Sequence, residues 1–130
     1  MSRNPKVSYS DWVAIDRKTS QNLGESPLNT NRELRITWLA LARLEPQRHA
    51  HFAVGELQQL LGVLVDKDTG LVKLPDRSSV HRSIAALIES GFLRSDSNSR
   101  CLVVNMNIAD YARAATGRDT RCPNLRRAAA

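Results

Sequence analysis

The stretch of sequence that decides the fold runs from Asp76 to Leu93 and reads DRSSVHRSIAALIESGFL. Asp76 is well suited to cap the first turn of a helix, because its carboxylate accepts a hydrogen bond from a free backbone amide. Gly91 is suited to end the same helix. Between them, apolar side chains follow the i, i+4, i+7, i+8 spacing of one helical face: Val80, Ile84, Leu87 and Ile88. The pattern therefore predicts a helix over residues 76–90.

The opposite side of this helix is predicted to be small and polar. Turning the apolar residues inward leaves five others outward: Ser78, Ser79, Arg82, Ser83 and Ala86. A helix fits the major groove of B-DNA, which is about 12 Å wide, and small side chains let its backbone approach the bases closely. This side of the helix is the first candidate for a binding surface.

Two hairpins are expected on either side of the helix. Residues 92–95 and 100–104 are rich in strand-forming residues, and the turn-forming cluster at 96–99 separates them, which predicts a β-hairpin. Residues 63–75 contain two β-prone pieces around Asp68-Thr69-Gly70. They predict a small hairpin or an extended loop.

Two more helices are expected upstream. Thr30-Asn31-Arg32-Glu33 fits a capping box, and Pro46 ends the helix that follows it. The predicted apolar stripe of this helix is Leu34, Trp38, Leu41 and Ala42, with Ile36, Leu39 and Leu44 outside it. A helix that is apolar around so much of its circumference is central in its domain or shared with a partner subunit.

The second of these helices is shorter and covers residues 53–61. Gly62 ends it, and residues 49–52 are expected to be a connector between the two helices. Its apolar residues are expected to face inward: Val54, Leu57, Leu60 and Leu61.

The two ends of the chain are less regular. Residues 1–29 are expected to form an N-terminal arm, with a possible short strand over 7–15 and a polar loop over 16–29. Residues 106–130 are expected to form a short helix and a flexible basic tail. This segment carries five arginines against two aspartates, which is half of the net charge of the chain.

Composition excludes several classes of protein. The 130 residues carry 19 basic and 13 acidic groups, a net charge of +6 that favours a polyanionic partner. No apolar run approaches the roughly 18 residues of a membrane span. The two cysteines, Cys101 and Cys122, are too few for a disulfide framework, so we expect reduced thiols and a cytoplasmic location. No catalytic motif is present, and His49-x-His51 lacks zinc-ligand spacing, so no enzyme activity, cofactor or metal is predicted.

The order helix, short helix, helix, hairpin resembles a winged helix-turn-helix domain. Residues 53–63 resemble the positioning helix of such domains, and residues 76–93 resemble their recognition helix and first wing strand. The resemblance covers residues 30–105 and extends to bacterial transcription regulators and to plasmid and phage replication initiators. It implies a mainly α fold with a small β-hairpin (α+β). One departure is that 63–75 is longer than the tight turn usual between the second and third helices.

This reading identifies candidate DNA contacts. Arg77 and Ser78, beside the helix N-terminus, suit phosphate contact. Arg82 suits a guanine edge or a phosphate, and it also has the plainer alternative of an ion pair with Asp76 or Glu89. Ser79, His81 and Ser83 complete the helical set, and His81 could equally sit at the edge of the core. Arg94 and Arg100 flank the wing tip, where they either contact the backbone or are ordinary solubilising charges.

The sequence therefore predicts a sequence-specific double-stranded DNA-binding protein, a transcription regulator that acts by occupying its operator. The apolar helix that follows residue 30 and the aromatic N-terminal segment favour a homodimer. One alternative is a replication or recombination accessory protein of a phage or plasmid. Another is a winged-helix protein-interaction module that does not bind DNA. The sequence does not indicate a small-molecule effector.

Overall fold

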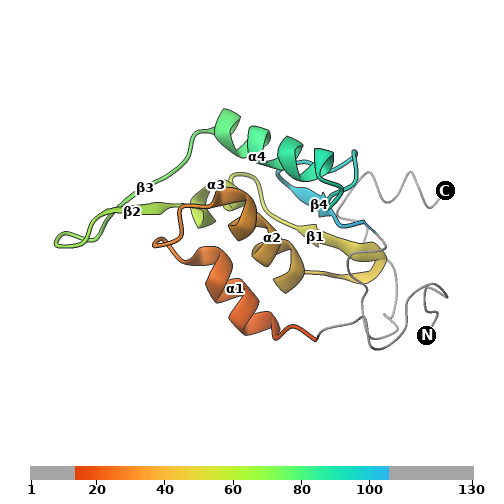
Figure 1. Cartoon of the computed structure of the whole chain (residues 1–130), viewed down its shortest axis with the longest axis horizontal. Helices are drawn as coiled ribbons and strands as arrows, with labels where there is room; N and C mark the ends of the chain where they lie inside the picture. The colour runs from red at the N-terminus through yellow and green to blue at the C-terminus, as the bar shows by residue number, and fades with distance from the viewer. Residues whose placement is uncertain (1–13, 106–130) are drawn as a thin grey trace.

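The computed structural model describes residues 14–105 as a mainly helical α+β arrangement (Figure 1). The coarse fold class predicted from the sequence is confirmed. Over the described residues the elements are α1 (Arg17–Glu25), α2 (Arg32–Ala42), the 3-10 helix η2 (Pro46–Arg48), β1 (His49–His51), α3 (Glu56–Leu60), β2 (Val63–Asp66), β3 (Leu71–Lys73), α4 (Arg77–Glu89) and β4 (Cys101–Val103).

Helix α1 corrects the loop expected over residues 16–29. Asp16 caps this helix by accepting a hydrogen bond from the Thr19 amide at 2.9 Å. The two buried residues of α1 are both small, Ser20 and Gly24. A Cβ on Gly24 would overlap the Leu39 side chain, so the absence of a side chain there allows the close helix contact. The helix was not predicted because its polar sequence has no apolar stripe and because Gly24 is typical of a loop.

Helix α2 is central, as its apolar sequence predicted, and lies between α1 on one side and α4 on the other (Figure 1). Two details of the prediction are wrong. Asn31, not Thr30, caps the helix, accepting from the Leu34 amide at 3.1 Å. The predicted inward stripe is also misplaced, because Leu34 is 42% exposed. The fully buried apolar residues of α2 do not belong to the predicted stripe: Ile36, Leu39 and Ala40.

A buried arginine in α2 joins three segments. Arg35 is 1% exposed, and its guanidinium donates to backbone carbonyls rather than to a carboxylate: Gly24 (2.8 Å), Asn29 (3.4 Å), Leu60 (2.8 Å), Leu61 (3.1 Å) and Gly62 (2.8 Å). Most of these carbonyls lie at the C-terminal ends of α1 and α3, where a helix carries partial negative charge. Burial lowers the pKa of the Arg35 guanidinium. Arg35 thereby fixes the start of the segment that follows α3.

Residues 49–52, expected to be a connector, contain strand β1 instead. Strand β1 pairs antiparallel with β4, and Ala50 lies opposite Leu102. The strand was missed because its partner lies about fifty residues away in the sequence, so no local pattern marks it. The hairpin expected over 92–104 is therefore only partly formed, because its second arm, β4, pairs with β1. Its first arm contributes a single bridge, Leu93 with Val104, to this sheet.

Helix α3 is shorter than predicted because it begins at Glu56. Gly55 precedes it with φ +76°, a left-handed conformation that favours glycine. Leu57 and Leu61 point into the core as expected, but Val54 precedes the helix and is 79% exposed. Of the two alternatives expected over 63–75, the structure has the hairpin, formed by β2 and β3 with a register shift between Leu64 and Asp66. It projects away from the rest of the molecule (Figure 1).

The core lies between α2, α3, α4 and the β1–β4 sheet. It gathers apolar side chains from each of them: Ile36, Leu39, Ala50, Phe52, Leu57, Leu61, Val80, Ile84, Leu93 and Leu102. Helix α4 has the predicted bounds, cap and inward residues, except that Ile88 is only partly buried. Burial of a Leu or Ile side chain contributes about 1.5–3 kcal/mol. The position of α4 is thus set by its apolar side.

Some expectations fall outside the described part of the chain. The strand over 7–15 lies almost entirely there, and so do the helix and tail of 106–130. Cys101 is disulfide-bonded, so the expectation of two reduced thiols is wrong, and the predicted cytoplasmic location loses that support. Within residues 14–105, none of the helices has the length and apolar character needed to cross a membrane.

Candidate nucleic-acid interface

The N-terminus of α4 is held by its cap. The Asp76 carboxylate accepts from the Ser79 amide at 2.7 Å and from the Ser78 hydroxyl at 2.9 Å. Hydrogen bonds from Ser79, above all from its amide, and from Ser78 lower the pKa of Asp76 to about 2. A carboxylate therefore already stands at this helix end, which reduces the attraction for phosphate that was expected of its free amides.

Helix α4 exposes most of the residues predicted to contact DNA. Arg77, Ser78, His81 and Arg82 are exposed, and Ser79 is partly exposed. Ala85 is exposed as well and lies one turn further along the helix than His81 and Arg82. We call the exposed set the α4 face: Arg77, Ser78, His81, Arg82 and Ala85.

Ser83 is the exception, and its assignment to the outward side is wrong. It is 2% exposed, and its hydroxyl accepts from Arg32 Nη1 at 3.3 Å. Position 83 is three residues after Val80 and four before Leu87, and both of these are core residues. Residues three and four apart share a helical face, so the spacing itself contained the signal. Ala85 takes the outward place that Ser83 was given.

Arg82 is oriented along the α4 face by a neighbouring side chain. Its Nη2 donates to Ser79 Oγ at 3.0 Å. Its charge also contributes slightly to the lowered pKa of Asp76. A hydroxyl partner orients the guanidinium without neutralising it, so Arg82 keeps its positive charge and its remaining donors for another ligand.

The turn between Leu93 and β4 is compact. The Asn98 side chain accepts from the backbone amides of Arg100 at 2.9 Å and of Cys101 at 3.1 Å, which folds the segment into a tight loop. Arg94 forms an ion pair with Asp96 at 2.9 Å. For Arg94 this geometry favours the plainer alternative of a solubilising charge. Arg100 is exposed at the other end of the turn.

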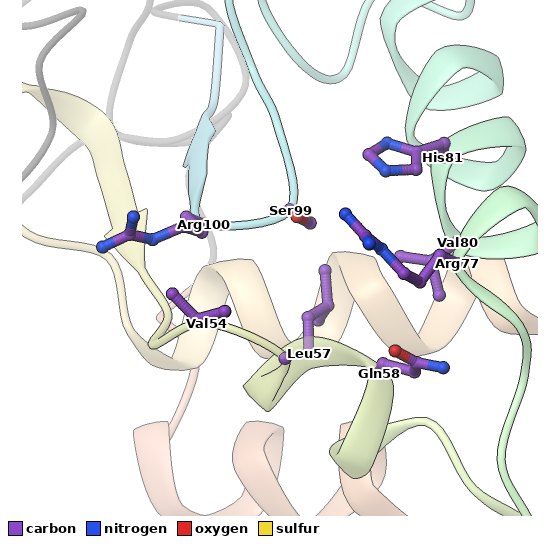
Figure 2. A pocket seen from close by; sticks show the side chains of 9 residues that line it. Val54, Leu57, Gln58, Arg77, Val80, His81, Ser99 and Arg100 are labelled. Carbon is purple, nitrogen blue, oxygen red and sulfur yellow. The ribbon is translucent and has the colours of Figure 1, made fainter.

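A pocket of about 290 Å³ lies between α3, α4 and this turn (Figure 2). Three predicted residues, Arg77, His81 and Arg100, line it. Figure 2 shows Arg77 reaching from α4 towards Ser99, whereas the Arg100 guanidinium points away towards β1. The apolar part of the lining comes from Val54, Leu57 and Val80. No carboxylate belongs to the lining, which suits an anionic group.

Sequence reasoning did not anticipate Gln58 and Ser99 in this lining. Gln58 Nε2 donates to the Pro75 carbonyl at 2.7 Å, which ties α3 to the start of α4. The position of Gln58 depends on how α3 packs against α4, and its own sequence context is that of an ordinary exposed glutamine. The neighbouring Asn98 was recognisable as a turn residue, and that signal would have placed Ser99 near the tip.

Neither metal chemistry nor a likeness to known proteins defines the site further. Within residues 14–105, no three histidine, cysteine or acidic side chains gather closely enough to hold a metal ion. No protein-family model, curated protein or solved structure matches this chain. The assignment therefore depends on the geometry alone.

Proposed function

We propose that this protein binds double-stranded DNA in a sequence-specific manner as a winged helix-turn-helix protein. In this proposal α4 enters the major groove, and the 94–100 turn lies against the adjacent backbone. The protein regulates transcription by occupying its operator.

The connectivity of the elements supports this proposal. The order α2, β1, α3, α4, β4, with β1 paired to β4 and Leu93 bridged to Val104, is compatible with a winged helix. The β2–β3 hairpin is then an insertion between the second and third helices of the motif. Gln58 and Arg35 hold the two ends of that insertion in place through backbone carbonyls.

The observation that carries the proposal is the exposure of the α4 face. The side of α4 opposite the core is uncovered along its first turns and bears two arginines and a histidine. In the described part of the chain, neither Arg77 nor Arg82 forms an ion pair. A protruding helix with small side chains and unpaired guanidinium groups is what the major groove accommodates.

Each residue of the face has a distinct role in this proposal. Arg82, already oriented by Ser79, presents its free donors to a guanine edge. Arg77 contacts a backbone phosphate beside the pocket, and Arg100, whose guanidinium points away from the pocket, contacts the backbone from the 94–100 turn. Ser78 and Ala85 are small enough to let the helix approach the bases.

Selection of bound duplexes from a random pool tests the proposal, followed by anisotropy titration of the recovered sequence. We expect Arg82→Ala to weaken binding to that sequence by about 10-fold or more, because a good bidentate base contact contributes about 1–3 kcal/mol. Lys18→Ala, on the exposed side of α1, is the matched control and should change affinity little. Recovery of no preferred sequence would refute sequence-specific binding.

A protein-interaction module is the second candidate, and the exposed apolar hairpin favours it. In that case the pool would yield no enriched sequence, and the protein would not bind DNA even at low salt. A replication or recombination accessory protein of a phage or plasmid would bind DNA through the same face. Transcript levels in a deletion strain separate that role from regulation.

A further inference from the structure

The β2–β3 hairpin leaves apolar side chains uncovered on both of its faces. Val65, Leu71, Val72 and Leu74 are 55%, 59%, 43% and 38% exposed. Paired residues share a face, so Leu64 and Val72 lie on one side of the hairpin, and Val63 and Lys73 lie on the other. An isolated two-stranded hairpin is only marginally stable in water, and three or more strands are usually needed.

The two edges of this hairpin differ. The β2 edge is protected, because the Leu64 amide donates to the Pro27 carbonyl at 2.8 Å and a register irregularity interrupts the strand before Asp66. On the β3 side, Leu71, Val72 and Lys73 are all exposed, and their strand is regular. Strand β3 thus lacks the register irregularity and the outside backbone contact that protect β2, although it is short and carries Lys73.

The hydrogen-bond pattern shows which groups face that edge. In an antiparallel ladder, two opposed residues exchange both backbone bonds or neither. Leu64 lies opposite Val72 but directs its amide away, to Pro27. The amide and carbonyl of Val72 must therefore also point away from β2, towards the open edge. Among residues 14–105, no backbone partner outside the hairpin is found for Val72.

The charges of the hairpin fit another copy of itself better than a polyanion. Residues 63–74 carry Asp66, Lys67, Asp68 and Lys73, so the hairpin has no net charge. If two β3 strands pair antiparallel about Val72, Lys73 lies opposite Leu71 of the second copy. No like charges then face each other across the new ladder, which would otherwise cost stability.

We propose that β3 pairs antiparallel with β3 of a second copy of this chain, about a twofold axis at Val72. The two Val72 residues exchange amide-to-carbonyl hydrogen bonds, and the hairpins join into one four-stranded sheet. Such an interface is isologous and closes as a dimer. Its three-residue strands make a small contact, so the expected dissociation constant is on the order of micromolar.

This surface is different from the one first expected for a homodimer. Helix α2 is covered by α1 and α4 of the same chain, so its apolar character is explained within one molecule. The hairpin dimer does not depend on DNA binding, because the α4 face contributes nothing to it. Its test therefore uses no DNA, and its failure leaves the proposed function standing.

Sedimentation velocity of the full chain from about 1 to 500 µM tests the proposal. We expect wild type to shift from monomer to dimer over this range. Val72→Lys and Val72→Glu should each weaken dimerisation at least 10-fold, because each places two like charges at the twofold axis. An equimolar mixture of the two variants should dimerise again. Leu34→Lys is the matched control, since Leu34 is 42% exposed and lies on α2; its dimerisation should match wild type.

Three results would overturn the proposal: wild type that stays monomeric at 500 µM, a Val72→Lys variant that dimerises as wild type does, or a mixture that stays monomeric. Thermal melting followed by circular dichroism establishes that the variants are folded. If the variants are not folded, hydrogen exchange of the wild-type protein tests the pairing of the two β3 strands. Exchange of the Val72 amide should slow at least 10-fold between dilute and concentrated protein, and an unchanged rate would refute the pairing.

Discussion

The α4 face and the β2–β3 hairpin are both uncovered, but their chemistry differs. The α4 face is polar and basic and belongs to a helix packed into the core by Val80, Ile84 and Leu87. The hairpin is apolar and neutral and projects from the body of the molecule (Figure 1). A rigidly supported basic helix suits a polyanion, whereas an apolar hairpin with an open edge suits another protein strand. The two surfaces therefore have separable roles, and the substitutions below test that separation.

The largest effect on stability is expected at Arg35, which supports both the α4 face and the β2–β3 hairpin through α3. Arg35→Met should lower the free energy of unfolding by about 3 kcal/mol or more, because it leaves buried carbonyls without their charged donor. Urea unfolding measures this. Arg77→Met, at an exposed arginine of the α4 face, is the matched control and should change stability by less than about 0.5 kcal/mol. A loss below 1 kcal/mol for Arg35→Met would mean that the carbonyls find other partners.

The next effect concerns only the α4 face. The double substitution Arg77→Ala/Arg82→Ala should weaken DNA binding about 100-fold, since it removes one base contact and one phosphate contact. Anisotropy titration against the selected duplex measures this, and the dimerisation constant measured without DNA should not change. A parallel loss of dimerisation would show that the two surfaces are coupled.

A smaller effect is expected at the junction of α3 and the hairpin. A methyl group on Gly62 would overlap the Val72 side chain, so Gly62→Ala displaces β3. We expect a loss of about 1–2 kcal/mol in unfolding free energy and weaker dimerisation, with DNA affinity kept. Gln59→Ala, at an exposed position of α3, is the control. Loss of DNA affinity in Gly62→Ala would contradict the separation of the two surfaces.

The smallest effect is the pH dependence of the α4 cap. The pKa of Asp76 is about 2 in the folded protein against 3.8 for an ordinary aspartate. A carboxylate with a lowered folded pKa stabilises the fold above the unfolded value, and that contribution declines as the pH falls from about 4 through 2. Asp76→Ala should therefore melt a few degrees below wild type at pH 7, and the difference between the two melting temperatures should shrink as the pH falls from about 4 to 2. A difference that is constant with pH would contradict the cap assignment.

The sequence predicted the elements that local patterns define. The cap and apolar spacing of α4 are one example, and the hairpin at 63–75, one of two alternatives expected there, is another. What it missed depends on contacts between distant residues. Strand β1 exists because of β4, α1 packs through Ser20 and Gly24, and Arg35 has the sequence context of a surface charge although it is buried.

The candidate site shows the same division. Exposure of Ser78 and Arg82 followed from the helical period, whereas His81 was left between a base contact and the edge of the core. Burial of Ser83 also followed from that period, but its polarity was given more weight than its spacing. The Arg94–Asp96 ion pair and the contribution of Ser99 to the pocket depend on the shape of one tight turn. That shape could not be read from the residue types alone.

The measurement that tests the central claim most directly is the salt dependence of binding to double-stranded DNA by the wild-type chain. Fluorescence anisotropy with a labelled random-sequence duplex of about 30 base pairs, from 50 to 200 mM salt, is sufficient. Contacts from Arg77, Arg82 and Arg100 to phosphates and bases predict binding at 50 mM that falls steeply as salt rises, with counterion release at each phosphate contact. The absence of any binding at 50 mM salt would contradict the account of the α4 face.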